Sequence, residues 1–145
     1  MKSKLLAENG GRTWALVFDK GDEVVETLTA FVTERRLSAA HFTAIGAFSE
    51  ALLGYFDRER KQYREIPVPD QVEVLSLIGD IAEEENNPRV HAHAVVGTST
   101  GDTRGGHLLS ARVWPTLELI LTETPAHLHK RSDPETGLAL IAPDL

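Results

Sequence analysis

Three histidines near the middle of the chain have the side-chain type and the spacing of metal ligands. His91 and His93 are separated by one residue, so on a β-strand both side chains leave the same face. Residues 98–102 (TSTGD) have the composition of a turn. A turn centred near Thr100 pairs residues whose numbers sum to about 200, which places His93 opposite His107. Three imidazoles on one sheet surface, with a fourth position open, are typical of catalytic zinc.

The same pattern has a simpler interpretation. Every second residue of this strand is apolar, so the two neighbouring histidines can reflect the alternation of a half-buried strand without any ligand role. A slip of one residue in the hairpin would also turn His107 to the opposite face. The apolar alternates are Val90, Ala92, Ala94 and Val96.

Composition limits the classes of protein to which this chain can belong. With 145 residues, 41% of them hydrophobic, it is expected to form one globular domain over residues 1–145. It has no cysteine, so a metal would need nitrogen and oxygen ligands. No segment has the pattern of a signal peptide, and no apolar run approaches the roughly 20 residues that span a bilayer. We therefore expect a soluble, cytoplasmic protein with no membrane partner.

The net charge bears on nucleic-acid binding. Fifteen basic residues stand against twenty-two acidic ones, which gives a formal charge of -7. DNA affinity depends on lysines and arginines that neutralise phosphates, and here they are dispersed along the chain. The charge therefore argues against DNA as a partner.

Hydrophobic periodicity predicts one helix and several strands. The helix is expected to begin after Asp22 as N-cap and to end near Leu37, with an apolar stripe at helical spacing. Gly46 is expected to permit a turn after the second strand, and residues 83–88 to form an exposed acidic loop. The sequence thus predicts an α+β fold, with a central, mostly antiparallel sheet of about seven strands and one long helix. The predicted strands are 11–18, 40–45, 51–56, 63–66, 71–81, the two arms of the histidine hairpin (within 89–113), 116–122 and 137–142.

One helix cannot cover both faces of such a sheet. Since large exposed apolar patches are uncommon on monomers, we expect part of the sheet to be buried against another subunit. The alternative is a sheet that curls into a closed barrel and covers itself.

Several segments together resemble one family, the plants-and-prokaryotes-conserved (PPC, or DUF296) domain, in a stand-alone bacterial form. The resemblance covers nearly the whole chain, and its most specific part is the HxH followed by GGHL. It implies an α+β fold with a central antiparallel sheet, a homotrimer, and a site near the subunit boundary where His91, His93 and His107 bind a metal such as zinc. The segments are AIGAFSEALLGYFD (44–57), VEVLSLIGDIA (72–82), HAHAVV (91–96), GDTRGGHLL (101–109) and LELILTE (117–123).

The family is also associated with DNA binding. Plant members carry an AT-hook, a short Arg-Gly-Arg-Pro element that inserts into the minor groove, beside this domain. The present sequence contains no such element. With a charge of -7, DNA binding by this chain is poorly supported by the resemblance. The domain, its trimer and its histidine site are what the resemblance implies for this chain.

Four further residues are candidates for ligand binding or for support of the histidines. Gly105 and Gly106 would allow the backbone to approach a ligand or a neighbouring strand closely, or would form a β-bulge. Glu73 and Glu118 each neighbour apolar strand residues and are candidates for an extra ligand, a hydrogen-bond partner of a histidine ring nitrogen, or a general base. The alternative for these carboxylates is an ion pair with an arginine such as Arg12 or Arg112.

The remaining histidines receive simpler interpretations. His127 and His129 form a second HxH, which we interpret as a solvated strand face, and His41 is expected to be structural.

The sequence therefore predicts a small homotrimer with a three-histidine, zinc-binding site for an unidentified small-molecule ligand or substrate. An open zinc position would permit hydrolysis or hydration, although no residue identifies a substrate. The alternative is a DNA-associated, transcription-related or protein-interaction module without catalysis, in which the histidines only bind a ligand or stabilise the trimer.

Overall fold

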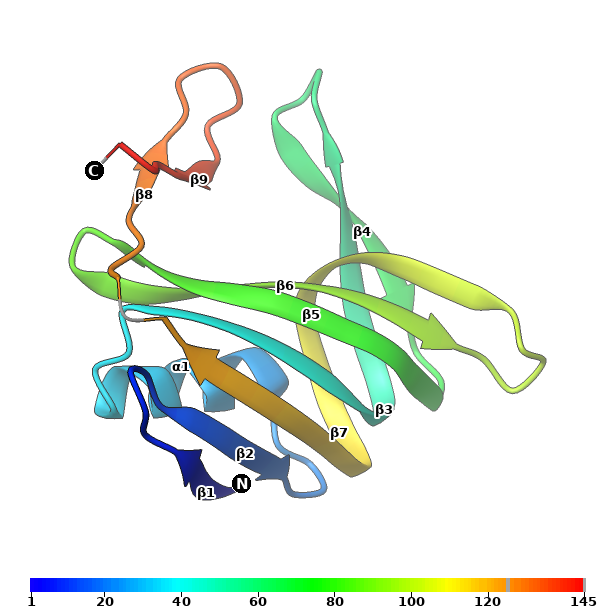
Figure 1. Ribbon diagram of the computed structural model, residues 1–145. Helices are drawn as coiled ribbons and strands as arrows, with labels where there is room; N and C mark the ends of the chain where they lie inside the picture. The colour runs from blue at the N-terminus through cyan, green and yellow to red at the C-terminus, as the bar shows by residue number, and fades with distance from the viewer. Residues whose placement is uncertain (125, 145) are drawn as a thin grey trace.

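The structure, a computed structural model, describes residues 1–124 and 126–144. It confirms the predicted α+β fold: a seven-stranded antiparallel sheet with one helix, accompanied by a separate two-stranded sheet (Figure 1). The elements are β1 (Lys2–Ala7), β2 (Thr13–Phe18), α1 (Val24–Glu34), β3 (Ala39–Asp57), β4 (Gln62–Val68), β5 (Val72–Glu84), β6 (Asn87–Gly97), β7 (Thr103–Glu123), β8 (Lys130–Ser132) and β9 (Ala139–Ile141).

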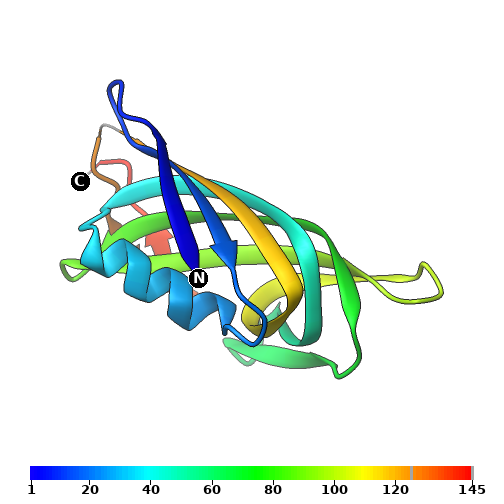
Figure 2. The ribbon, with the colours of Figure 1, turned by 90° about the horizontal axis from the view of Figure 1, so that it is seen from below.

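The large sheet curls on itself. Its strand order is β1-β2-β7-β6-β5-β3-β4, and β7 additionally pairs with β3. The pairings β3–β5, β5–β6, β6–β7 and β7–β3 therefore form a closed circuit, as the barrel alternative predicted in part. The buried side chains of the strands face inward and form one hydrophobic core with the apolar side of α1, which lies across the sheet in Figure 2.

The helix begins one residue later than predicted. The N-cap is Glu23, whose carboxylate accepts hydrogen bonds from the backbone N–H groups of Glu26 at 2.6 Å and Ala111 at 3.0 Å. The Asp22 carboxylate instead accepts a hydrogen bond from the N–H of Asp19. The helix also ends at Glu34, three residues before the predicted position.

Two predicted breaks between strands are wrong. β3 runs without interruption through residues 46–50, where a turn was expected, and β7 continues past Pro115. Gly46 allows a close approach of β7, because a Cβ atom on this residue would lie 2.7 Å from the Cα of Leu117. The pairing of β3 with β7 shifts register just beyond Gly46, so this glycine accompanies a bulge within a continuous strand.

Three other segments differ from the predictions. β1 was not predicted, and the predicted strand at 137–142 is the short β9, which pairs only with β8 within the described residues. The acidic stretch at 83–88 is the end of a hairpin, in which only Glu85 and Asn86 form the turn, and both have positive φ, of 49° and 63°. Two central residues of this kind are characteristic of a type I′ turn, which closes a two-residue hairpin between β5 and β6.

The outer face of the curled sheet, which α1 does not cover, carries six large apolar side chains that are 38–63% exposed. We call these six residues the outer apolar patch. Ile120 and Ile78 lie on either side of Thr43, which pairs with both, and Ile78 pairs with His93. No helix in the described chain is long and apolar enough to cross a membrane. The patch consists of Val17, Ile45, Leu75, Ile78, Val95 and Ile120.

Candidate metal centre

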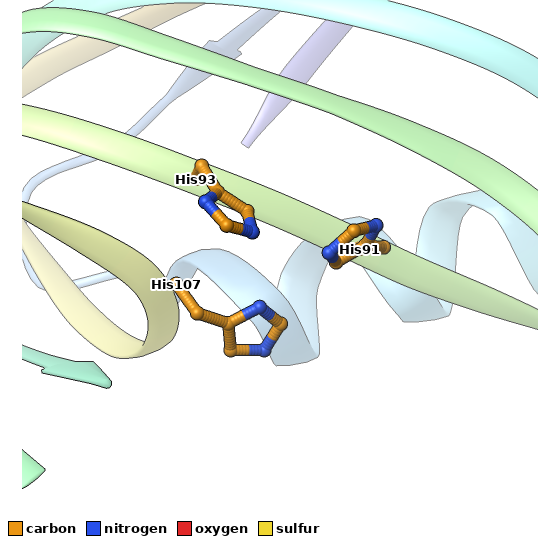
Figure 3. Close-up of side chains that lie close together, drawn as sticks. All are labelled: His91, His93 and His107. Carbon is orange, nitrogen blue, oxygen red and sulfur yellow. The ribbon is translucent and has the colours of Figure 1, made fainter. Parts of the chain in front are cut away.

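The predicted register of the histidine hairpin is correct. His93 on β6 pairs directly with His107 on β7, and His91 projects from the same face of β6. The three rings converge in Figure 3, with centroid separations of 5.1 to 5.4 Å. Each residue offers one ring nitrogen, and these three nitrogens lie within 4.8 Å of one another.

This arrangement fits a divalent transition metal. The three nitrogen ligands of a tetrahedral zinc stand roughly 3.3 Å apart, given Zn–N bonds of about 2.0–2.1 Å. Small side-chain rotations would bring the present nitrogens to that spacing. The Nδ1 atom of His107 is buried and has no hydrogen-bond partner within residues 1–124 and 126–144. Because a buried polar atom without a partner is costly, this nitrogen indicates a ligand that the chain itself does not supply.

The electrostatics keep two of the rings neutral. Burial, together with the neighbouring His91, His93 and Lys130, lowers the pKa of His107 to about 4. Burial and the nearby His91 also lower the pKa of His93 below its ordinary value. Both imidazoles are therefore uncharged at neutral pH, which is the form that coordinates a metal.

The third histidine is oriented by a carboxylate. Asp80 lies opposite His91 in the β5–β6 pairing, and its Oδ2 atom is 3.0 Å from Nδ1 of the ring. Burial raises the pKa of Asp80, but the hydrogen bond to His91 and the charge of Lys130 outweigh burial, so the net pKa lies below the ordinary value. An ionised carboxylate can only accept, so Nδ1–H of His91 donates and Nε2 remains free to bind a metal.

Two more residues border the histidines. Lys130 reaches Asp80 from the C-terminal segment, with Nζ 3.2 Å from Oδ1, and its side chain is only 6% exposed. Tyr63 on β4 stacks on His107, with ring centroids 4.6 Å apart and an angle of 22° between the planes. Burial raises the pKa of Tyr63, so the phenol stays protonated. The sequence interpretation did not identify Asp80, Lys130 or Tyr63.

The two candidate glycines allow strands to approach each other closely. A Cβ atom on Gly106 would lie 2.7 Å from the carbonyl oxygen of Gly54 on β3, and one on Gly105 would lie 3.3 Å from that of Ala94. These glycines therefore lie close to the backbone of neighbouring strands. The close packing at Gly106 fixes the position of the adjacent His107.

The two candidate carboxylates lie outside the triad. Glu73 and Glu118 are exposed, and Glu118 borders a hollow on the outer apolar patch. Neither is among the ion pairs of the described residues, in which Arg12 contacts Glu123 at 2.7 Å and Arg112 contacts Glu50 at 3.7 Å. A role of either carboxylate in supporting the site stays a prediction.

The other histidines lie apart from the triad. His127 and His129 both face Glu83, with Nδ1 atoms 3.9 and 3.7 Å from the same carboxylate oxygen. His127 also shares a 2.7 Å hydrogen bond with the hydroxyl of Ser38. His41 is exposed on β3, where it borders a hollow beside His91 and His93.

A curled antiparallel sheet crossed by one helix, with three histidines on its outer face, defines a small α+β domain with a candidate metal centre. The chain belongs to the Plants and Prokaryotes Conserved (PCC) domain family, also written PPC, whose sequence model matches residues 6–125. The predicted family is therefore confirmed.

Solved structures of prokaryotic proteins share the fold over nearly their whole length. A metal-containing protein from Archaeoglobus fulgidus is 32% identical with a TM-score of 0.84, and the match covers 96% of this chain and 99% of that one. A PPC protein from Pyrococcus horikoshii is 30% identical with a TM-score of 0.86, covering 97% and 94%. A candidate DNA-binding protein from Ralstonia eutropha JMP134 is 31% identical with a TM-score of 0.86, covering 96% and 95%.

Among curated proteins, the bifunctional protein GlmU of a Synechococcus strain is 28% identical over 120 residues. This match covers 81% of the present chain but only 18% of that much longer protein.

Proposed function

We propose that this domain binds a divalent transition metal, zinc, through His91, His93 and His107. The observation that carries the proposal is the convergence of three ring nitrogens around a buried, unpartnered Nδ1 of His107. The chain has no cysteine, and an all-nitrogen set of neutral imidazoles suits zinc. The metal-containing relative from Archaeoglobus fulgidus supports the binding of a metal by this domain.

Three protein ligands leave a coordination position for a small molecule. A zinc ion bound by the three histidines would supply Lewis-acid chemistry. It would polarise a carbonyl group and lower the pKa of bound water, as hydrolysis or hydration requires. Asp80 would hold the His91 ring in the metal-binding tautomer, and Tyr63 would pack the His107 ring in place. The function is therefore metal-dependent binding of a small ligand at this position.

The experiment that tests this proposal is a calorimetric titration of metal-stripped, tag-free protein with zinc chloride. We expect one zinc ion per chain in the wild type and loss of tight binding in His93→Ala. The variant His127→Ala, which changes a histidine outside the triad, should retain one zinc ion per chain. Tight binding that survives His93→Ala would remove the triad from consideration.

We further propose that the domain assembles as a homotrimer through the outer apolar patch. Six large apolar side chains on one uncovered sheet face are more than monomers commonly expose together. Ile78 of the patch pairs with His93, so a subunit covering the patch would also approach the histidines. Self-association would thus shield the metal centre from solvent.

A second candidate function is DNA association, which the name of the Ralstonia eutropha relative favours. The charge of -7 opposes it, because phosphate binding needs an excess of positive charge. Retention on DNA at low salt that weakens steeply as salt rises would support this alternative, whereas no retention at low salt would remove it.

A further inference from the structure

A pocket of about 280 Å³ opens beside the proposed metal centre. Its lining includes His91, His107, Tyr63 and Lys130. This volume lies just below the range for small-molecule sites, which is roughly 300 Å³ upward. The pocket therefore suits a small ligand that contacts the metal position and the lysine together.

We propose that this pocket binds the carboxylate of a small organic ligand, held between the metal and the Lys130 ammonium. The inference rests on the proposed metal function and adds the chemical class of the ligand. A carboxylate has two oxygens, so one can bind the metal while the other accepts a charge-assisted hydrogen bond from the lysine.

The Lys130 side chain lies largely enclosed at the edge of the pocket, and its ammonium has donors to spare for a ligand. Its side chain is 6% exposed, and within the described residues its one ion pair is with Asp80, at 3.2 Å. The Asp80 carboxylate is shared, because its other oxygen accepts the hydrogen bond from His91. An ammonium group has three donors, so Lys130 can donate a hydrogen bond to an oxygen of a bound ligand beside its contact with Asp80.

The charges around the pocket also favour an anion. Arg89 is paired with Glu84 at 2.8 Å, and Lys130 with Asp80, so these four side chains balance one another. A divalent metal bound by neutral histidines would then leave two uncompensated positive charges at the pocket. This net positive charge would attract ligands of the opposite sign.

The C-terminal segment holds Lys130 in place. Leu128 lies two residues before the lysine, and its carbonyl oxygen accepts a 2.7 Å hydrogen bond from the N–H of Glu83 on β5. Lys130 then pairs with Ile141 of β9, and residues 138–140 of the same segment form a wall of the pocket. The ammonium is thus fixed before a ligand arrives, which reduces the entropy lost on binding.

The proposal can be tested with cobalt(II), whose visible absorption reports a change in its coordination. Tag-free protein loaded with cobalt is titrated with sodium acetate at pH 7 and constant ionic strength, and in parallel with acetamide, a neutral molecule of the same shape. We expect acetate to change the spectrum with saturation, and acetamide to have little effect over the same concentrations.

Variants of the lysine test its contribution. Lys130→Met should weaken acetate binding roughly tenfold, because a hydrogen bond between charged groups is lost, and Lys130→Arg should restore part of it. The matched control is Arg131→Met, which changes the next residue, an exposed arginine paired with Asp144. This control should bind acetate within about twofold of the wild type.

Each outcome is informative. An equal response to acetate and acetamide, or unchanged acetate affinity in Lys130→Met, would overturn the carboxylate site while cobalt binding stands. Lys130→Met could fail to bind cobalt. The carboxylate site is then tested by comparing acetate with acetamide in the wild type and by titrating Lys130→Arg with acetate. A wild-type protein that takes up no cobalt would defeat the proposed metal function, and this inference with it.

Discussion

Asp80 and His91 are direct neighbours across the β5–β6 pairing, and the Asp80 carboxylate accepts a 3.0 Å hydrogen bond from Nδ1 of the imidazole. This bond fixes the ring tautomer that exposes Nε2 toward the other two histidines. The same carboxylate contacts Lys130, so one side chain links the proposed metal ligand to the Lys130 ammonium.

We predict that Asp80→Asn weakens zinc binding roughly tenfold. This is the lower end of the loss in metal affinity seen when the hydrogen-bond partner of a metal-binding histidine is removed. The amide oxygen can still accept the hydrogen bond, so the loss reflects the missing negative charge. Competition with a chromophoric chelator measures the affinity. Asp102→Asn is a matched control, since Asp102 accepts its hydrogen bond from Thr100 in the hairpin turn. Equal zinc affinity in Asp80→Asn and wild type would show that Asp80 does not support the site.

The metal-free protein should lose stability as the pH falls. The pKa of His107 is about 4 in the folded chain, against 6.5 for the unperturbed group, mainly because of burial. As the pH falls through 6.5, His107 becomes protonated in the unfolded chain, whereas in the folded chain it stays neutral until about pH 4. The free energy of unfolding therefore decreases over this window. Urea midpoints of metal-free protein between pH 7.5 and 4.5 measure the effect, and His107→Gln should flatten the dependence. An equally steep dependence in that variant would contradict the assignment.

The glycine beside His107 should be sensitive to a single methyl group. A Cβ atom on Gly106 would lie 2.7 Å from a backbone oxygen, so Gly106→Ala should cost about 1–3 kcal/mol of stability and displace His107. Gly105→Ala is the matched control, because its Cβ atom would lie 3.3 Å from the nearest backbone oxygen and needs only a small shift. Chemical denaturation and zinc titration of both variants test this. The prediction fails if Gly106→Ala is as stable as Gly105→Ala.

A charge in the outer apolar patch should prevent self-association. Ile78 is 54% exposed beside His93, and in a trimer formed through the patch Ile78→Glu would bury an unpaired carboxylate. Sedimentation velocity should show a trimer for the wild type and monomers for the variant. Ile141→Glu, on β9 outside the patch, should remain trimeric. A monomeric wild type, or a trimeric Ile78→Glu, would refute assembly through this face.

The sequence could predict the histidine hairpin because its register depends on a short turn. The turn at 98–102 determines that His93 meets His107, and apolar alternation determines which face the histidines share. The family resemblance rested on motifs in the same region. Local geometry and motif spacing were therefore sufficient for the triad.

Asp80 was missed because the acidic stretch that follows it was interpreted as a loop. Glu85 and Asn86 form a two-residue turn, and this turn alone places Asp80 opposite His91. An asparagine in a short polar stretch between two apolar segments was the available signal. Recognising the hairpin would have identified the carboxylate next to the ligand.

Lys130 had no comparable local signal. It reaches the site because the C-terminal segment docks on β5, a contact between residues 50 positions apart in the sequence. Long-range docking of this kind depends on the packing of the whole domain. The continuous β3 and β7 were missed for a related reason, since Gly46 and Pro115 resemble breaks until the neighbouring strand is known.

The central claim is tested most directly by the native metal content of tag-free protein, measured by mass spectrometry. We predict close to one transition-metal ion per chain, zinc by identity, in the wild type and in a His127→Ala/His129→Ala control. A folded His91→Ala/His93→Ala double variant should contain almost none. No metal in the wild type, even after incubation with zinc, or equal metal in the triad variant, would contradict a metal centre at these histidines.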